Sequence, residues 1–418
     1  MGTMTATQAT TGDALSVGIV STYPPTECGL ATFSAALANG LRSCGGDAAV
    51  HSACRVGVVE LVDQQRLSAD DVVFQVVRDD MRSVAAAASW LNGFDAVVVQ
   101  HEYGIFGGVD GDDVLGIVDG VDRPIVTVLH TVLDSPNPHQ REVLEALCRR
   151  SATVVVMTYA ARTRLLERFT VEARRVVVIP HGAHENRSLA TDHRSHQQPT
   201  VLTWGLLGPG KGIEAGIEAM SHLRSMIPPP HYVVAGQTHP KVREASGEAY
   251  RDSLKAHARE MGVAHMVHFD DEYRDLTDLK ALIRSADVVL LPYESRDQVT
   301  SGVLIEAVAS GKPVVSTDFP HARELLSSGA GIVVPHGSTE AMSSALERVL
   351  HDHRLARSMA AEAARISAPT MWDAVARRYL DVLVGLAVSQ PRFSDLDLPF
   401  DRRDHVRTSR VDYASHVA

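Results

Sequence analysis

The chain has 418 residues, of which 45% are apolar and 22% charged, and 40 Lys and Arg against 51 Asp and Glu give a formal net charge of −11. This composition is ordinary for a globular protein, and the acidic balance argues against a broad basic face for nucleic acid or anionic lipid. The apolar runs are too short for a membrane-spanning helix, and the first residues lack the features of a signal peptide.

Short runs rich in Val and Ile alternate with segments of helical spacing. Runs that are apolar at nearly every position are typical of parallel strands covered on both faces. The predicted strands are Val17–Val20, Val72–Val77, Ala96–Val99, Ile125–Leu129, Thr153–Met157, Val176–Ile179, Val201–Trp204, Tyr232–Ala235, Met266–Phe269, Val288–Leu291, Val314–Ser316 and Ile332–Val334. Strand–helix alternation of this kind predicts an α/β fold.

A polar, non-periodic segment divides the chain. It runs from His184 to Pro199 and predicts a linker over residues 184–199, between domains at 14–183 and 200–368. Residues 1–13 are expected to be disordered, and a helical pattern over 369–388 precedes a tail at 389–418. The four cysteines lack metal-site spacing and are expected to be free thiols in a reducing cytoplasm.

A glycine-rich turn opens the second half, in the sequence VLTWGLLGPGKGIEAGIEAM. Gly205 and Gly212 let a phosphate approach the backbone, and Lys211 adds a positive charge at the start of a helix. The plain alternative is a turn with a solvated lysine. A P-loop NTPase is disfavoured, because Gly212 stands where that motif needs Ser or Thr for magnesium.

A second motif follows in the sequence LPYESRDQVTSGVLIEAVASGKPVV. A short helix is predicted from about Ser301, so the N–H groups of Ser301, Gly302 and Val303 could hold a diphosphate. Glu306 lies on the same face as Gly302 and could accept hydrogen bonds from a ribose diol. Glu306 could instead be a surface carboxylate, but apolar neighbours on this helix favour a partner for its charge.

Further candidates follow other predicted strands. His130 ends one strand and is either a core histidine or a catalytic one. His101, Glu102 and Tyr103 end another and are candidates for lining a ligand site, because ligands bind beyond the carboxyl ends of parallel strands.

Two more groups of polar residues each have more than one possible role. Gln237, His239 and Lys241 could face a bound nucleotide, and Asp270 and Asp271 could approach its base or form a turn. The histidines near the linker (His181, His184, His193, His196) suit a solvated segment better than a metal site, so no metal site is predicted.

In their order, these motifs resemble retaining glycosyltransferases of family 4, which have the GT-B fold. The hallmark of that family is Glu, seven residues, Glu-Ala and then Gly-x-Pro-Val-Val. This chain has Gln298, seven residues, Glu306–Ala307 and then Gly311–Val315. The elements TYPPTECGLATF, VTVLHT, VVVIPHG, WGLLGPGKG and IVVPHGSTEAM also occur in the family's order. The resemblance covers roughly residues 15–385.

The resemblance implies two Rossmann-like α/β domains that face each other across a cleft, with the last helix (369–388) crossing back to the first domain. It implies retaining transfer of a hexosyl group from a nucleoside diphosphate sugar to a carbohydrate or glycolipid hydroxyl. The donor would contact Gly29, Gly205, Lys211, Gly212, Ser301, Gly302, Val303 and Glu306. His130 would sit near the reacting carbon, and Gln298 would take the place of the first family carboxylate. His101, Glu102 and Tyr103 would line the acceptor side.

No bound metal or cofactor is expected from this resemblance. GDP-mannose is preferred over UDP-glucose as the donor. A monomer or homodimer in the cytoplasm is expected, with peripheral membrane contact left open and nucleic acid not expected as a partner.

Two positions depart from the family pattern. Gln298 replaces a carboxylate, and Leu206 stands where the family commonly has Arg, so one cation on the diphosphate is missing. Arg296 or Arg274 could replace it. These departures favour a divergent subgroup, and they keep open a catalytically weak nucleotide-sugar-binding regulatory protein of the same fold.

Overall fold

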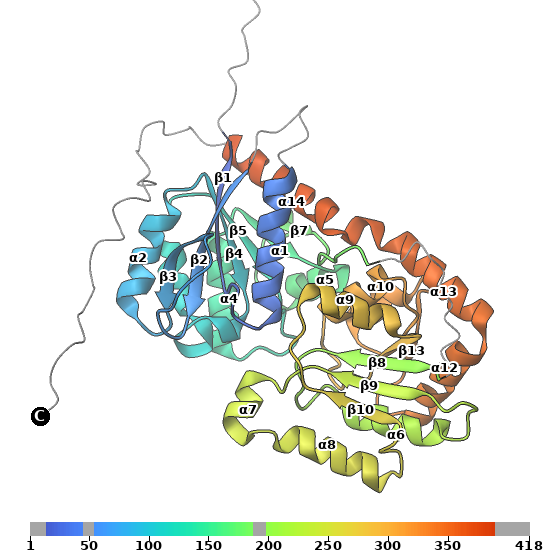
Figure 1. Ribbon diagram of the computed structural model, residues 1–418. Coiled ribbons are helices and arrows are strands. Elements are labelled where there is room, and N and C mark those ends of the chain that lie inside the picture. The colour runs from blue at the N-terminus through green and yellow to red at the C-terminus, as the bar shows by residue number, and fades with distance from the viewer. Residues whose placement is uncertain (1–13, 45–53, 187–197, 389–418) are drawn as a thin grey trace, which may run out of the picture.

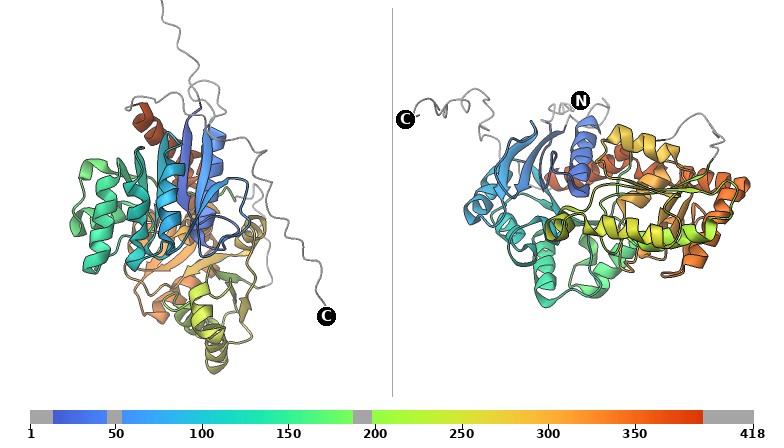
Figure 2. Two further views of the ribbon diagram at one scale, coloured as in Figure 1. Left: turned by 90° about the vertical axis from the view of Figure 1, so that its left-hand side faces the viewer. Right: turned by 60° about the horizontal axis from the view of Figure 1, so that its bottom comes forward.

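The computed structural model describes residues 14–44, 54–186 and 198–388. The predicted N-terminal segment 1–13, most of the predicted linker and the tail 389–418 lie outside the described residues. Within them the chain forms two α/β lobes, each built on one sheet (Figure 1). Figure 2 shows the same two lobes from two other sides.

The first lobe contains a parallel sheet of seven strands in the order β3-β2-β1-β4-β5-β6-β7. Its strands are β1 Ser16–Ser21, β2 Arg55–Val62, β3 Val72–Val77, β4 Ala96–His101, β5 Ile125–Leu129, β6 Thr153–Val156 and β7 Val176–Val178. Helices α1 Gly29–Cys44, α2 Met81–Leu91, α3 Asp113–Asp119, α4 Pro138–Arg150 and α5 Tyr159–Arg168 connect them, with 3-10 turns at Tyr103–Ile105, Val109–Gly111 and Ala173–Arg175.

The second lobe contains a parallel sheet of six strands in the order β10-β9-β8-β11-β12-β13. Its strands are β8 Thr200–Trp204, β9 His231–Ala235, β10 Val267–Asp270, β11 Val288–Leu291, β12 Val314–Thr317 and β13 Gly331–Val334. Its helices are α6 Ile213–Leu223, α7 Pro240–Ser246, α8 Ala249–Glu260, α9 Leu276–Ser285, α10 Gly302–Ala309, α11 Pro320–Leu326, α12 Thr339–His351 and α13 His353–Ile366. A 3-10 turn at Ala368–Thr370 leads into the last helix, α14 Trp372–Val388.

All twelve predicted strands are present, and β2 is a strand that the sequence reading missed. Its sequence, RVGVVELV, is interrupted by Gly57 and Glu60, so it lacks an unbroken apolar run. Glu60 is nevertheless fully buried, because Arg66 and Gln75 bond to its carboxylate at 2.5 and 2.8 Å. A buried charge is tolerated when it is paired in this way.

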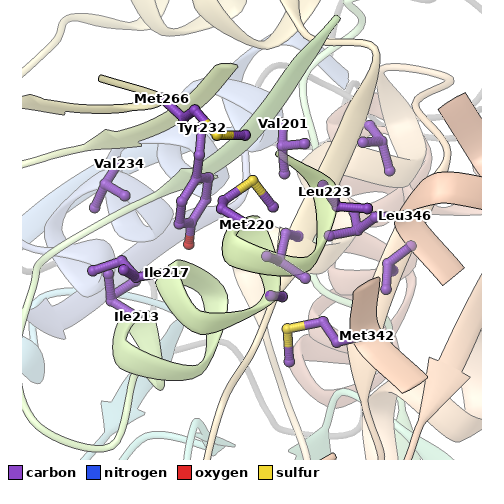
Figure 3. Close-up of a cluster of buried hydrophobic side chains, with 14 of the residues drawn as sticks. Val201, Ile213, Ile217, Met220, Leu223, Tyr232, Val234, Met266, Met342 and Leu346 are labelled. Atoms are coloured by element: carbon purple, nitrogen blue, oxygen red, sulfur yellow. The ribbon is translucent and has the colours of Figure 1, made fainter. Parts of the chain in front are cut away.

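The core of the second lobe lies between its sheet and α6. Ile213, Ile217 and Met220 lie on one face of α6, four and three positions apart, and are fully buried against β9 (Figure 3). In the same cluster the hydroxyl of buried Tyr232 lies 3.0 Å from Thr203 Oγ1, so its polar end has a partner.

The last helix returns to the first lobe, as predicted. In Figure 1 it runs in red along the upper edge of the molecule and ends beside α1. Tyr379 and Leu383 of α14 belong to the buried cluster of the first lobe, together with Phe33 and Leu37 of α1. Among the described helices, none combines the length and apolarity needed to cross a membrane.

In each sheet the order in which the chain adds strands reverses at a central pair. This pair is β1 and β4 in the first lobe and β8 and β11 in the second. In open parallel sheets a crevice for ligands forms beyond the carboxyl ends of such a pair. The segments after these four strands contain Gly29, Glu102, Lys211 and Gln298. The fold therefore places most predicted site residues at the two switch points.

Candidate active site

The lobes meet at a cluster of aromatic and histidine rings. Phe33 of α1 lies edge-on to His130, His181 and Trp372, with ring centroids 4.9, 5.0 and 5.0 Å away. Nε2 of His181 lies 3.0 Å from where a Cβ on Gly302 would be. The first residue of α10 therefore approaches the first lobe closely, and a side chain at position 302 would crowd His181.

His130 is an uncharged imidazole at the end of β5. Its Nε2 lies 2.8 Å from Oε1 of buried Gln100. Burial lowers the pKa of His130 to about 3, and the nearby His181 and His101 act in the same direction. A neutral ring at this place can form hydrogen bonds to a sugar, but it adds no positive charge near pH 7.

The start of α10 differs from the prediction at one of its three amides. The Ser301 N–H donates to Nδ1 of His321 at 2.8 Å, and the Ser301 hydroxyl accepts from the Leu304 N–H at 3.2 Å. The Ser301 amide is therefore already used within the protein. The N–H groups of Gly302 and Val303 have no acceptor among the described residues. These two amides remain available to an anion at the helix start.

His321 was not predicted from the sequence. It lies on α11, is 3% exposed, and burial lowers its pKa to about 3. Because its Nδ1 accepts from Ser301, the neutral ring carries its proton on Nε2. Nothing in the local sequence marks this residue, since Ser301 is 20 positions away.

Glu306 has the partner that its apolar helix required. Its Oε1 lies 3.0 Å from His184 Nδ1, and its carboxylate accepts the His184 N–H at 3.3 and 3.4 Å. The prediction of a solvated linker is wrong for this stretch, because Asn186 is only 4% exposed and bonds to Ser310. The residues just after the first lobe therefore help to form the site.

The glycine-rich turn has the backbone that only glycine adopts readily. Gly205 and Gly212 have φ of 120° and 64°. A Cβ on Gly212 would lie 1.9 Å from the Pro292 carbonyl oxygen, so no serine or threonine fits there. This removes the magnesium-binding hydroxyl of a P-loop for a steric reason.

The turn also lies beside α10. A Cβ on Gly205 would be 3.8 Å from the Val303 side chain, and the Glu294 N–H donates to the Gly210 carbonyl at 3.0 Å. Lys211 Nζ lies 4.7 Å from the centre of the Tyr293 ring, and burial lowers the pKa of this lysine. Lys211 forms no ion pair with any described residue. A partly buried cation without a carboxylate favours an anionic ligand.

The loop that carries Gln298 is anchored in the other lobe. Val299 is 4% exposed and belongs to a buried cluster of the first lobe, and its carbonyl accepts from Thr158 Oγ1 at 2.9 Å. Arg164 of α5 donates to the Asp297 carbonyl at 2.5 Å. Gln298 itself donates from Nε2 to the Thr300 carbonyl at 3.0 Å. Both lobes therefore determine the position of Gln298.

A carboxylate from the second lobe caps a helix of the first. Glu324 of α11 accepts the N–H groups of Tyr159 and Ala160 at 3.0 and 2.8 Å, in the first turn of α5. Negative charge at this end of a helix is stabilising. The sequence reading missed this contact, whose partners are 165 and 164 residues apart.

The three predicted acceptor residues differ in burial and in their contacts. His101 is fully buried, burial lowers its pKa to about 4, and neither ring nitrogen has a described partner. It therefore does not line an acceptor surface, because its ring is enclosed by Tyr103 and Phe106. Glu102 accepts from the Thr131 hydroxyl, and burial raises the pKa of its carboxyl. Tyr103 donates to the Gln140 carbonyl at 3.3 Å.

The structure also describes the surroundings of Gly29, Arg274 and Arg296. Gly29 is the first residue of α1, and no atom lies within 4 Å of where its Cβ would be. Arg274 is ion-paired with Asp270, so it is not a free replacement for the missing cation. Arg296 is exposed. Among the described residues, no group of three or more His, Cys, Asp or Glu side chains could hold a metal ion.

The first lobe has a pocket that the sequence reading did not identify. Its volume is about 400 Å³, and it lies beyond the carboxyl ends of β1, β2 and β3. Its lining is mostly polar and consists of Thr22, Thr26, Leu61, Val62, Asp63, Gln64, Gln65, Arg66 and Arg78. A pocket of this size with several hydrogen-bonding side chains suits a small polyhydroxylated ligand.

Comparison with known proteins agrees with this architecture. Residues 188–366 match the family described as "Glycosyl transferases group 1". The chain is 27% identical over 287 residues to D-inositol 3-phosphate glycosyltransferase of Jonesia denitrificans, covering 62% of this chain and 65% of the relative. It is 27% identical to alpha-D-kanosaminyltransferase of Streptomyces kanamyceticus, covering 53% of this chain and 56% of the relative. The chain thus spans less than two thirds of the length of these two relatives.

A third relative is named for its donor. The chain is 26% identical over 272 residues to GDP-mannose-dependent alpha-(1-6)-phosphatidylinositol monomannoside mannosyltransferase of Mycobacterium tuberculosis, covering 61% of this chain and 68% of the relative.

Solved structures show the same fold. Anabaena Alr3699/HepE, crystallised with UDP and glucose, superposes with a TM-score of 0.71 at 16% identity, covering 89% of this chain and 100% of that one. Sucrose-phosphate synthase of Thermosynechococcus elongatus superposes with a TM-score of 0.72 at 18% identity, covering 90% and 100%. The chain therefore has the GT-B fold, and its second lobe matches the group 1 glycosyl transferase model over residues 188–366.

Proposed function

We propose that this protein transfers a hexosyl group, with retention of configuration, from a nucleoside diphosphate sugar to a hydroxyl of a carbohydrate or glycolipid. The observation that carries the proposal is Lys211, a partly buried cation without an ion pair among the described residues, on a glycine-rich turn that lies beside a helix start with two available amides. An anion with more than one oxygen could bind the lysine and the amides together.

The donor would lie along the second lobe. Lys211 and the N–H groups of Gly302 and Val303 would hold the diphosphate, with Gly205 and Gly212 giving close backbone approach. Glu306, held by His184, would accept hydrogen bonds from the ribose. Charge develops on the diphosphate as the sugar leaves, so these contacts would stabilise the transition state more than the ground state.

The sugar would lie at the junction of the lobes. His130 is neutral and Gln298 is an amide, so both would contribute hydrogen bonds to sugar hydroxyls and no charge. Gly29, with open space where its Cβ would be, would let the start of α1 approach the diphosphate.

The acceptor would bind to the first lobe. The polar pocket beyond β1, β2 and β3 and the carboxylate of Glu102 are its proposed contacts. We prefer GDP-mannose as the donor, supported by the name of the mycobacterial relative, and place UDP-glucose second because a structural neighbour was crystallised with UDP and glucose. Transfer without a metal ion, by a cytoplasmic monomer or homodimer, completes the proposal.

Incubation with radiolabelled GDP-mannose and with UDP-glucose tests this proposal. We expect release of the nucleoside diphosphate from one of them, equally with and without EDTA. The Lys211→Met variant should lose most of this activity. No turnover with either donor, despite tight nucleotide binding, would contradict the proposal for these donors.

A second candidate function is supported by position 298. The Gln298 side chain donates to the Thr300 carbonyl of its own loop, and it cannot supply the negative charge of the family carboxylate. A catalytically weak regulatory protein that binds a nucleotide sugar could have an amide in place of this carboxylate. In that case the Gln298→Glu variant should turn over the donor faster than the wild type, whereas an enzyme adapted to Gln298 should lose activity.

A further inference from the structure

The proposed diphosphate site contains one cation, Lys211, for a ligand with at least two negative charges. Leu206 stands at the position of the missing arginine, and Arg274 is engaged by Asp270. We propose that Lys241, at the start of α7, is the second cation that binds the donor diphosphate. This inference rests on the proposed function, because it assigns a further residue to the same donor site.

The backbone before Lys241 is fixed to the phosphate-binding turn. The Leu207 N–H donates to the Gln237 carbonyl, and the His239 N–H donates to the Leu207 carbonyl, both at 2.8 Å. A Cβ on Gly208 would lie 3.3 Å from the Val242 side chain. The segment from Gln237 to Val242 and the glycine-rich turn therefore form one packed unit.

The side chain of Lys241 reaches the junction of the lobes. Its Nζ lies 3.3 Å from where a Cβ on Gly104 of the first lobe would be. No hydrogen bond or ion pair of this ammonium group to a described residue is present. The carboxyl group of Glu102 is nearby. Burial raises its pKa, and the charge of Lys241 lowers it. Glu102 already accepts a hydrogen bond from the Thr131 hydroxyl. The Lys241 charge is therefore available to a ligand that enters between the lobes.

Lys211 and Lys241 act on the same small region. His239, two residues before Lys241, lies against the glycine-rich turn, since a Cβ on Gly208 would be 3.8 Å from its Cβ. Burial lowers the pKa of His239 most, and the charges of Lys241 and Lys211 lower it further. Two ammonium groups that both act on one imidazole, neither ion-paired with a described residue, repel each other. A diphosphate carries at least two negative charges and would relieve this repulsion.

Nucleotide binding by three variants tests the assignment. Isothermal titration with GDP and UDP, and with guanosine and uridine, compares wild type with Lys241→Met and Lys241→Arg. Lys255→Met is the matched control, because Lys255 on α8 pairs with Asp252 at 3.9 Å and with no other residue that the structure describes. We expect Lys241→Met to weaken diphosphate binding at least about tenfold and nucleoside binding less than about twofold, the loss of one charge-assisted contact to phosphate. Lys241→Arg should keep most of the affinity, and Lys255→Met all of it.

The possible results distinguish a failure of the Lys241 assignment from a failure of the proposed function. If wild type binds GDP or UDP and folded Lys241→Met binds it equally well, the assignment of Lys241 is wrong and the proposed function stands. Equal weakening of nucleoside and diphosphate would also overturn it, because the contact would then be to the base or ribose. If wild type binds neither diphosphate, the proposed function fails and this inference with it.

Discussion

Three imidazoles, those of His130, His181 and His321, are kept uncharged where the two lobes meet. Burial lowers the pKa of each, to about 3 for His130 and His321. A neutral ring can both donate and accept a hydrogen bond, whereas a cation here would repel a positively charged, oxocarbenium-like sugar. The positive charge of the site is instead on lysine, near the proposed leaving group.

These depressed pKa values predict a loss of stability in acid. A histidine with a folded-state pKa of about 3 or 4 binds fewer protons in the native state than in the unfolded state, whose pKa is about 6.5. Stability is therefore fully present above pH 6.5 and decreases as the pH falls toward the folded-state pKa. Each such group contributes a slope of about 1.4 kcal/mol per pH unit. Urea unfolding at pH 7.5, 6.0 and 5.0 measures this slope.

His101 offers a clean version of this test. Neither of its ring nitrogens has a described partner, and its ring is packed between Tyr103 and Phe106. His101→Phe should preserve this packing and reduce the slope below pH 6.5 by about 1.4 kcal/mol per pH unit. The exposed His222→Gln is the control and should change nothing. A stability that does not depend on pH between 7.5 and 5.0 would contradict the account.

Glu306 gives the second prediction at the residue scale. Glu306→Ala should weaken the binding of the donor by roughly 1–3 kcal/mol, because hydrogen bonds to a charged group are lost. His184→Ala should weaken it less, since the carboxylate remains. Titration calorimetry with GDP and UDP measures both, with exposed Glu340→Ala as the control. An unchanged dissociation constant for folded Glu306→Ala would refute its ribose role.

Among the helices and strands, the features that could be predicted from the sequence are those encoded by contiguous residues. Twelve strands were predicted because each is an apolar run, and β2 was missed because Glu60 interrupts its run and finds its partners elsewhere. The glycine-rich turn and the start of α10 were predicted because their residues are contiguous. His321, Glu324 and Arg164 could not be, because their roles come from contacts across 20 to 165 residues.

The cap of α5 by Glu324 yields an element-scale prediction. Glu324→Gln should destabilise the protein by about 1 kcal/mol, because a charged acceptor at the first turn of a helix is replaced by a neutral one. Hydrogen exchange at the amides of Tyr159 and Ala160 should accelerate at the same time. Exposed Glu244→Gln on α7 should leave both quantities unchanged. Slow exchange in the Glu324 variant would show that the cap does not hold α5.

At the scale of the whole molecule, the two lobes share a loop and a helix. Val299 of the second lobe is buried in the first, and α14 returns to pack on α1. Relative movement of the lobes must either preserve the contact at Val299 or displace the neighbouring Gln298. The shared loop therefore couples the arrangement of the lobes to the proposed sugar site.

Val299→Ala tests this coupling. Removing two methyl groups from a buried cluster should cost roughly 1–2 kcal/mol of stability. If the loop positions Gln298, kcat for donor turnover should fall several-fold while donor affinity changes little. Val171→Ala touches the same cluster away from the loop and should reduce stability without lowering kcat. Equal kcat in the two variants would separate the loop anchor from catalysis.

Retaining glycosyl transfer at the junction of the two lobes would preserve the anomeric configuration of the donor sugar. Proton NMR of the anomeric signal during turnover of GDP-mannose or UDP-glucose, in the presence of EDTA, follows this configuration. We expect release of the nucleoside diphosphate and a first-formed sugar product with the α configuration of the donor, and loss of both in Lys211→Met. A β-configured first product, or turnover that requires magnesium and persists in Lys211→Met, would contradict this expectation.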